Sequence, residues 1–406
     1  MEDQAQAVGS RVRYWRMRRN IDRQRFADMV GRSISWVDKI EKGERSLARL
    51  PMLERVAEAL SVDPKVLTDG PSARRAADCV DANEVRAIRA ALSSYPSLAV
   101  GSGARESTSS LKAINGQLAY IGEAWLSSHF TVVARHLPDL IRNVQSVALT
   151  ADAENYVSSQ RALVTTYRLA SSMLLKFDAV EIAWLAADRA MQAALQSDDT
   201  WALARATRSV ARAMTSTGQE GQALAVISGM LDRMRPEVGG DQDLLPMYGM
   251  LFLAGSIAAA KQGDPHVALQ MHKDADRLAI DNKLRLSGDP GTFGSANVAV
   301  HRVSALARLN EGNEALRYVS LVDPKIISTL PTERRANYLL DLSTANIQTG
   351  RYDSAARALG EAERLAPEEV RCRPLAHGLL RSLVRNTGGE LGRTVQRIAT
   401  RAGVEA

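Results

Sequence analysis

Apolar residues recur at helical spacing along nearly the whole chain, and almost no segment shows the alternation of a strand. Near the N-terminus, Val8, Val12 and Trp15 form one apolar stripe, which predicts a first helix. Asp22 is suited to cap a second helix, and Gly31 is suited to end it. The pattern therefore predicts an all-helical chain that begins with two short helices.

The next segment, residues 31–43, has the pattern of a turn, a short helix and a glycine stop. Ser33 is the expected N-cap, and Val37 and Ile40 are spaced to form an inward apolar face. The opposite face carries Ile34, Ser35, Asp38 and Lys39. A short helix that is held by its apolar back and has a free leading edge can enter the major groove of DNA. DNA binding is therefore the first functional hypothesis.

Two further segments complete this unit: a helix over residues 51–60, with Pro51 in its first turn, and a short turn over residues 63–67. Residues 8–69 resemble the phage-repressor (XRE-type) helix-turn-helix domain. The motifs that carry the resemblance are Asp22-Arg23-Gln24, Phe26-Ala27, Gly31, Ser33, Ile40-Glu41-Lys42-Gly43 and Leu60. Ile34 departs from the commonest pattern, in which this position is polar; an apolar side chain there suits contact with a thymine methyl group.

The positive charge of the chain is concentrated in the same segment. Residues 1–75 hold 16 Lys or Arg and 11 Asp or Glu, which is +5 of the net +6 of the whole chain. Taken alone, an arginine-rich helix is usually a solvated face. Combined with the helix-turn-helix spacing, the local excess indicates phosphate contact and salt-dependent DNA binding.

Composition changes after this unit. Residues 70–75 and residues 95–103 have the composition of linkers, and a helix over residues 82–92 is expected between them. We therefore expect the DNA-binding head to be tethered to the larger remainder of the chain.

The remainder shows internal repeats. In the clearest unit, residues 336–369, small Ala355 and Ala362 allow close helix packing, Tyr352 and Leu359 fill the space, and Pro367 stops the helix. This unit resembles the tetratricopeptide repeat, including its period of ~34 residues. Fainter copies centre on Ala183, Ala223, Ala268 and Ala315. Residues 370–404 have the pattern of a closing helix pair, which covers the last apolar face of a solenoid.

These patterns predict an all-α fold, with an N-terminal five-helix helix-turn-helix domain followed by a right-handed tetratricopeptide-like α-solenoid. The expected DNA-binding domain is residues 1–70, and the linker with its short helix is residues 71–108. The expected repeats occupy residues 109–369, and capping helices occupy residues 370–406.

No constellation of residues indicates catalysis, so an enzyme is not expected. The glycine-bearing segment 287–294 lacks the Lys-Ser/Thr of a phosphate loop. His266 and His272 are six residues apart, which does not place both on one helix face as in metal-binding pairs. We therefore expect neither a metal nor a cofactor.

Cysteine usage and hydropathy bear on the compartment. Cys79 and Cys372 are far apart in the sequence and unaccompanied, which predicts two unpaired thiols rather than a disulfide framework or a zinc site. No apolar run approaches the ~20 residues that cross a bilayer, and the N-terminus lacks the regions of a signal peptide. A cytoplasmic protein without a membrane span is expected.

The predicted solenoid offers a concave wall on which a ligand could bind. Arg205, Arg208 and Arg212 recur at i, i+3 and i+7 of one helix, so the three guanidiniums share a face. The candidate effector-binding residues on this wall are Arg168, Arg205, Arg208, Arg212, Asn297 and Asn337. Arginine and asparagine suit the carboxylate and amide groups of a peptide. The alternative interpretation is a solvated or salt-bridged outer face.

The whole chain resembles single-component bacterial regulators that join an XRE-type head to a tetratricopeptide sensor, including the peptide-sensing RRNPP group and actinobacterial regulators. Motifs such as Leu137-Pro138-Asp139-Leu140 and Arg373-Pro374 contribute to this resemblance. It implies sequence-specific binding of double-stranded DNA as a homodimer, with a helical body that senses a peptide or small-molecule effector. The alternative is a tetratricopeptide scaffold that captures a partner protein, with DNA binding secondary.

Specific roles follow for the N-terminal unit. Ser33 is expected to cap the recognition helix, with Ile34, Ser35, Lys39 and Asp38 facing base edges. Trp36 is expected either to stack on the sugar-phosphate backbone or to support the fold. The expected phosphate contacts, which would fix the register on DNA, are Arg23, Lys42, Arg45 and Arg49.

Overall fold

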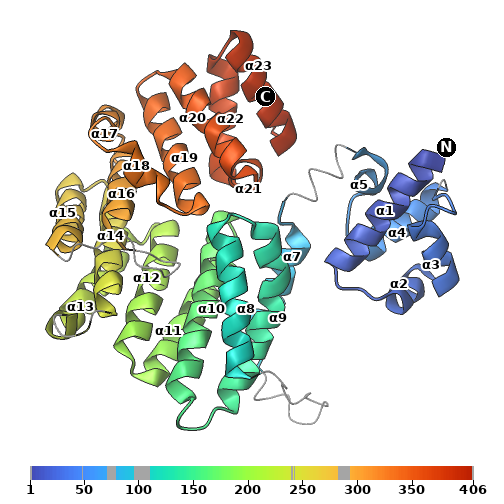
Figure 1. The fold of residues 1–406 in the computed structure, drawn as a ribbon, viewed down its shortest axis with the longest axis horizontal. Helices are drawn as coiled ribbons and strands as arrows, with labels where there is room; N and C mark the ends of the chain where they lie inside the picture. Colours follow the sequence, from blue (N-terminus) through green and yellow to red (C-terminus); the bar gives the residue numbers. More distant parts are fainter. Residues whose placement is uncertain are drawn as a thin grey trace. The chain divides into compact units, whose positions relative to one another are not determined.

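The computed structural model describes residues 2–47, 49–70, 79–95, 110–238, 241, 243–281 and 293–404. These residues form helices and no strand, which confirms the all-α fold class (Figure 1). The chain divides into two compact units, residues 1–83 and residues 84–406. The first linker expected, residues 70–75, and the second, residues 95–103, lie almost entirely outside the described residues.

The N-terminal unit contains five described helices around a single core. They are α1 (Glu2–Arg18), α2 (Arg23–Val30), α3 (Ile34–Glu41), α4 (Leu50–Leu60) and α5 (Pro64–Thr68). Asp22 caps α2 by accepting a hydrogen bond from the backbone N–H of Arg25, and Gly31 ends the helix with φ of +64°. The core joins Val12 and Trp15 of α1 to the inward residues of the other helices. The five helices agree with the sequence pattern.

A glycine sets the close approach of α1 and α3. A Cβ atom on Gly9 would lie only 2.1 Å from the backbone oxygen of Ile40. The contact is with backbone rather than with the end of a flexible side chain, so any larger residue would push the two helices apart. Gly9 therefore helps to fix where α3 sits on its own domain.

The C-terminal unit is an array of helix pairs, preceded by α7 (Ala82–Leu92). The pairs are α8 (Leu111–Leu126) with α9 (Phe130–Leu149), α10 (Tyr156–Lys176) with α11 (Val180–Ser197), α12 (Thr200–Ser216) with α13 (Glu220–Val238), α14 (Leu244–Gln262) with α15 (Pro265–Asp281), α16 (Ser295–Arg308) with α17 (Gly312–Val319), α19 (Thr332–Gln348) with α20 (Tyr352–Leu365), and α22 (Pro374–Asn386) with α23 (Gly389–Ala402). Short helices α18 (Pro324–Ser328) and α21 (Pro367–Arg371) lie between pairs.

The repeat pattern explains how the pairs stack. The first helices α10, α12, α14, α16 and α19 each pack against the next, as in a solenoid. The alanines on which the repeats were centred are all fully buried: Ala183, Ala223, Ala268, Ala315 and Ala355. Small side chains at these points allow the second helix of each pair to approach its neighbours closely. The predicted α-solenoid is confirmed, and α22 and α23 form the last helix pair of the array.

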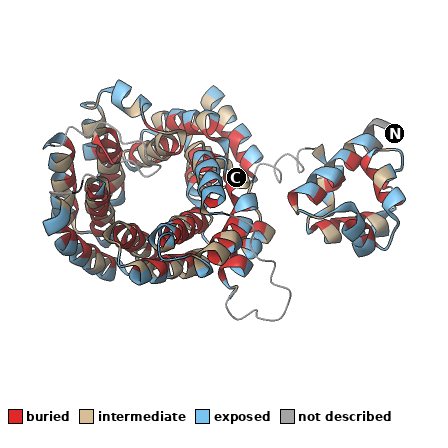
Figure 2. Cartoon of the chain, turned by 60° about the horizontal axis from the view of Figure 1, so that its bottom comes forward, coloured by how far each residue is buried: buried red, intermediate tan, exposed pale blue. Residues whose placement is uncertain are grey.

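The array also closes on itself, which the sequence pattern did not predict. Helix α8, the first helix of the paired array, packs against α19, which lies near the end of the array. The backbone N–H and the hydroxyl of Thr131 both donate to the carboxylate of Glu368, at 2.9 and 3.1 Å. Figure 2 shows the helices of this unit arranged as a ring, with buried residues lining the faces where they meet.

Two expectations about the chain are corrected. Helix α14 is long and apolar enough to cross a membrane, contrary to the expectation that no run approaches this length, and 61% of its most apolar window is buried. Its Gly249 and Gly255 face Phe293 and Met271, so α14 has the packing of a core helix. Neither cysteine is a free thiol, so the expectation of two unpaired thiols, which rested only on sequence separation, is wrong.

Candidate DNA-binding surface and basic cavity

Local interactions cap the N-terminus of α3 and fix its orientation on the domain core. The Ser33 hydroxyl accepts a hydrogen bond from the backbone N–H of Trp36 at 3.2 Å, as predicted for its N-cap. Val37 and Ile40 are almost completely buried and hold the back of the helix against the core. The other side of the first two turns is left exposed, as the major groove requires.

The predicted base-facing residues lie on this exposed side. Ile34 is 44% exposed, and Ser35 and Lys39 are also exposed. Ser35 and Lys39 line a shallow depression together with Ser33 and Arg45. Arg32 also lines this depression, which therefore combines two serine hydroxyls with three cationic side chains, and Asp28 adds one carboxylate.

Trp36 and Asp38 are more constrained than the other candidates. Trp36 is only 8% exposed and belongs to the domain core, which favours the prediction that it supports the fold. The carboxylate of Asp38 lies 3.3 Å from Arg23 and 3.8 Å from Lys42. Because Asp38 is engaged with these two cations, it orients the side chains that were predicted to contact phosphates.

The remaining candidates for phosphate contact are accessible. Arg23, Lys42, Arg45 and Arg49 are all exposed. Arg23 also lies 3.3 Å from the buried carboxylate of Glu41, so it is anchored while its outer side faces solvent. Their roles remain predictions, with a surface that is accessible for each of them.

Part of the positive charge counted in the sequence is structural. Arg16 is 7% exposed and grips Glu41 with two hydrogen bonds of 2.5 and 3.1 Å. Arg18 and Arg19 cover the Trp15 ring, and Arg19 also pairs with Asp81 at 2.5 Å. These three arginines hold the domain together rather than form a free basic face. The sequence showed only that they were arginines, because their partners lie elsewhere in the chain.

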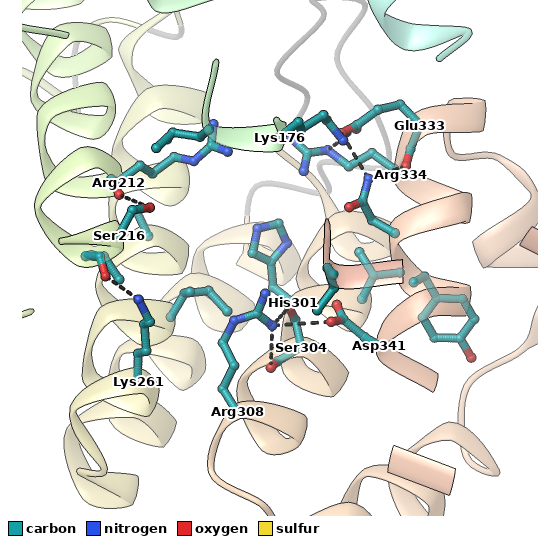
Figure 3. Close-up of a pocket in the computed structure, with 18 of the residues that line it drawn as sticks. Lys176, Arg212, Ser216, Lys261, His301, Ser304, Arg308, Glu333, Arg334 and Asp341 are labelled. Atoms are coloured by element: carbon teal, nitrogen blue, oxygen red, sulfur yellow. Dashed lines mark hydrogen bonds and ion pairs between the residues drawn. The ribbon is translucent and has the colours of Figure 1, made fainter. Parts of the chain in front are cut away.

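The C-terminal unit contains a cavity of about 320 Å³ with many cationic lining residues, which we call the basic cavity (Figure 3). Its walls come mainly from α10, α12, α14, α16 and α19. Two carboxylates line it, Glu333 and Asp341. The cationic lining residues are Lys176, Arg208, Arg212, Lys261, Arg308, Arg334 and Arg373.

Two arginines of α12 that line the basic cavity have lowered pKa values. Burial, followed by the charges of Arg212, Arg334 and other nearby arginines, lowers the pKa of Arg208 well below its usual value. Burial and Arg334 likewise lower the pKa of Arg212 to about 10. Burial and the mutual repulsion of the guanidiniums therefore act in the same direction on these two pKa values, and Glu333 opposes them at Arg212.

His301 of α16 also lines the basic cavity. Its Nδ1 lies 2.8 Å from the backbone oxygen of Asn297. Burial, and then the positive charge of Arg334, lowers the pKa of His301 well below its usual value. His301 is therefore neutral at pH 7 in the free protein.

A buried ion network lies at one edge of the cavity and joins distant parts of the array. Lys176 of α10 pairs with Glu333 of α19 at 2.8 Å and with Glu369 of α21 at 2.6 Å. Glu369 also pairs with Arg373 at 2.5 Å. Burial alone would raise the pKa of Glu333, but attraction to Lys176, Arg334 and Arg373 holds it well below its usual range.

The candidate effector residues are distributed over different places. Arg208, Arg212 and Asn337 line the basic cavity. Arg168 and Arg205 line a second cavity of about 260 Å³, where Arg205 lies over the Trp201 ring at 4.4 Å. The α12 arginines line these two cavities, and their role in effector binding remains a prediction, with the solvated or salt-bridged face as its alternative.

Asn297 and Asn337 differ from the arginines in their surroundings. Asn297 is fully buried, donates to the sulfur of Met250 and lines neither cavity. Asn337 accepts from Arg373 at 2.7 Å and donates to Glu369 at 3.2 Å, so it belongs to the ion network. The spacing of the α12 arginines gave no sign of four other lining residues, which lie on other helices: Lys176, Glu333, Arg334 and His301.

Comparison with known proteins agrees with the N-terminal geometry. Residues 7–69 match the family model described as a helix-turn-helix domain. Two solved structures are similar to the chain. They are the apo form of ComR from S. thermophilus, at 15% identity, covering 68% of this chain and 95% of that chain with a TM-score of 0.22, and the apo form of the competence regulator ComR from Streptococcus vestibularis, at 16% identity, covering 68% and 92% with a TM-score of 0.20.

Similarity at these TM-scores supports no residue-by-residue correspondence with ComR. A comparison with curated proteins finds no match. The N-terminal unit is a helix-turn-helix domain, as its sequence motifs predicted. Among the described residues, no group of three or more His, Cys, Asp or Glu side chains is arranged to hold a metal ion.

Proposed function

We propose that this protein is a sequence-specific, DNA-binding transcriptional regulator whose helical ring senses an effector. The observation that carries the proposal is the leading edge of α3, where Ser33 caps the helix and Ile34, Ser35 and Lys39 are exposed. A capped and exposed recognition helix in a helix-turn-helix domain is the arrangement that reads base edges in the major groove.

Two kinds of contact with DNA would have different functions. Ile34, Ser35 and Lys39 would contact base edges and select the sequence. Arg45 and its exposed cationic neighbours would contact phosphates and fix the register. As a homodimer, the protein would bind two half-sites about 34 Å apart, or one helical turn of DNA.

The closed array supports the sensing part of the proposal. An effector that prefers one curvature of the ring would shift the equilibrium toward it and change how two heads reach their half-sites. A scaffold with an open groove for a partner protein is less well supported, because α8 packs against α19 and closes the array. The same proposal assigns the protein to the cytoplasm, where a bacterial regulator meets chromosomal DNA.

A binding scan on genomic DNA fragments, followed by footprinting, tests the DNA-binding part. Lys39→Ala should reduce binding to the preferred site more than binding to random DNA, by about 1–3 kcal/mol in discrimination. Arg45→Ala should weaken both by the same factor and reduce the salt slope by about one. Equal losses on both DNAs for Lys39→Ala, or no protected site in the genome, would contradict the proposal.

A further inference from the structure

The basic cavity contains positive charges that its own carboxylates leave uncompensated. Asp341 is engaged with Arg308 at 3.3 Å, and Glu333 is engaged with Lys176 at 2.8 Å. Among the described residues, no carboxylate lies within 4 Å of the guanidinium of Arg208. Its Nε atom is buried and has no hydrogen-bond partner in that part of the chain.

Arg212 and Arg334 add to the same local excess. Arg212 donates to the neutral hydroxyl of Ser172 at 2.9 Å, and Arg334 reaches Glu333 only at 3.5 Å. Desolvated guanidiniums without a close counter-charge are costly for a folded protein. The cost is removed when an anion binds between them, because an anion supplies both charge and hydrogen-bond acceptors.

We propose that the basic cavity binds a compact organic anion with at least two negative charges, carried on phosphate or carboxylate groups and held by Arg208, Arg212 and Arg334. The planar guanidinium of arginine matches both groups through paired hydrogen bonds. Its role as the effector of a regulator rests on the function proposed above.

The size and lining of the cavity limit the size of the ligand and the character of its uncharged part. A volume of about 320 Å³ is at the lower end of small-molecule sites. Ala254, Ile257 and Val300 provide an apolar wall for a small non-polar part. An extended peptide advances ~3.3 Å per residue and needs an open groove. The contact of α8 with α19 closes this array instead.

The site is connected to the closure of the ring. Arg334 lies beside Glu333 on α19, and Glu333 pairs with Lys176 on α10. An anion held by Arg334 and by the α12 arginines therefore bridges helices whose mutual positions set the ring. Binding stabilises the closed ring because the like charges on these helices no longer repel each other.

Thermal unfolding and calorimetry of the full chain test the proposal, with pyrophosphate and citrate as probes and sodium chloride at matched ionic strength as the blank. At millimolar concentration, at least one probe should raise the Tm by about 3–6 °C. Stabilisation by pyrophosphate alone assigns phosphate groups to the ligand, and stabilisation by citrate alone assigns carboxylates.

Two single variants locate the site. Arg208→Gln and Arg334→Gln should each weaken the probe by about 10- to 100-fold, because each removes hydrogen bonds to a charged group. The Tm of free Arg208→Gln should not fall, whereas loss of a purely structural arginine would lower it. Arg317→Gln is the matched control: its side chain is 72% exposed, is paired with Glu314 and lies outside the cavity.

The outcomes separate this proposal from the regulator proposal. It is overturned if neither probe stabilises the protein or if both variants bind the probes as the wild type does. Footprinting on the same preparations is independent of the cavity. If the probes fail while a protected DNA site remains, only the anion proposal is wrong. If the probes bind while no DNA site is protected, the cavity is an anion site in a protein that is not a regulator.

Discussion

Arg16 in the N-terminal unit and Arg208 in the C-terminal unit both have side chains that lie against other protein groups rather than in open solvent. The groups that surround them differ. Arg16 grips the Glu41 carboxylate with two hydrogen bonds and donates a third to the backbone oxygen of Ile21. Burial, and then the charges of nearby arginines such as Arg212 and Arg334, lower the pKa of Arg208. A buried arginine that is fully paired is part of the fold, whereas we propose that Arg208, which is half-buried and has no close carboxylate among the described residues, binds a ligand.

The largest expected effect is from breaking the fully paired arginine. Arg16→Met should destabilise the N-terminal unit by about 3–5 kcal/mol, because the buried Glu41 loses its bidentate partner. Urea denaturation measures the loss, and DNA binding should weaken with it. Arg13→Met, at an exposed position of the same helix, is the control. Equal stability of the two variants would show that Arg16 is not a structural arginine.

A similar loss is expected where the ring closes. Lys176→Met leaves the buried carboxylates of Glu333 and Glu369 without their shared cation. The C-terminal unit should lose about 3 kcal/mol, and α10 should exchange amide hydrogens faster, while the N-terminal helices keep their protection. Hydrogen exchange followed along the chain measures both parts. Unchanged protection of α10 would mean that the network does not hold the ring closed.

In the basic cavity, removal of an arginine is expected to raise the stability of the free protein rather than lower it. Arg208→Met removes a charge that has no close carboxylate, so the free protein should gain about 1–2 kcal/mol of stability. The same measurement as for Arg16→Met gives a direct comparison of the two arginines. A loss of stability similar to that of Arg16→Met would remove the distinction between the units.

The smallest expected effect is a pH dependence. The pKa of Glu333 is held below its usual value, so its contribution to stability is complete above about pH 4.5 and is lost as the pH falls further. This one group adds a slope of at most about 1.4 kcal/mol per pH unit. Denaturation between neutral and acidic pH should show a shallower slope for Glu333→Gln. The same substitution at exposed Glu390 should leave the slope unchanged.

Several parts of the molecule followed from local sequence. Asp22 and Ser33 cap their helices, and Gly31 ends one with positive φ, as their positions predicted. The buried alanines of the repeats lie where the small-residue pattern placed them. Predictions about single helices succeeded because capping and helix periodicity depend on residues within a few positions of one another.

The candidate sites were only partly predictable for the same reason. The spacing of Arg205, Arg208 and Arg212 put them on one helix, but it did not show that Arg205 faces a different cavity from the other two. Arg16 was only one of the 16 Lys or Arg residues counted in positions 1–75, because its partner, Glu41, is 25 positions away and local spacing does not reveal it. The apolar α14 was not distinguished as a core helix, since composition alone does not show what covers it.

The sequence by itself determined the all-helical fold, the helix-turn-helix with its capped α3, and the repetition of helix pairs. Only the tertiary structure decided that the array closes, bringing Lys176 to Glu369 across 193 positions and gathering cations from several helices around one cavity. The physical reason is that each repeat fixes its own helices locally, whereas closure depends on small packing angles added over every repeat between the two ends.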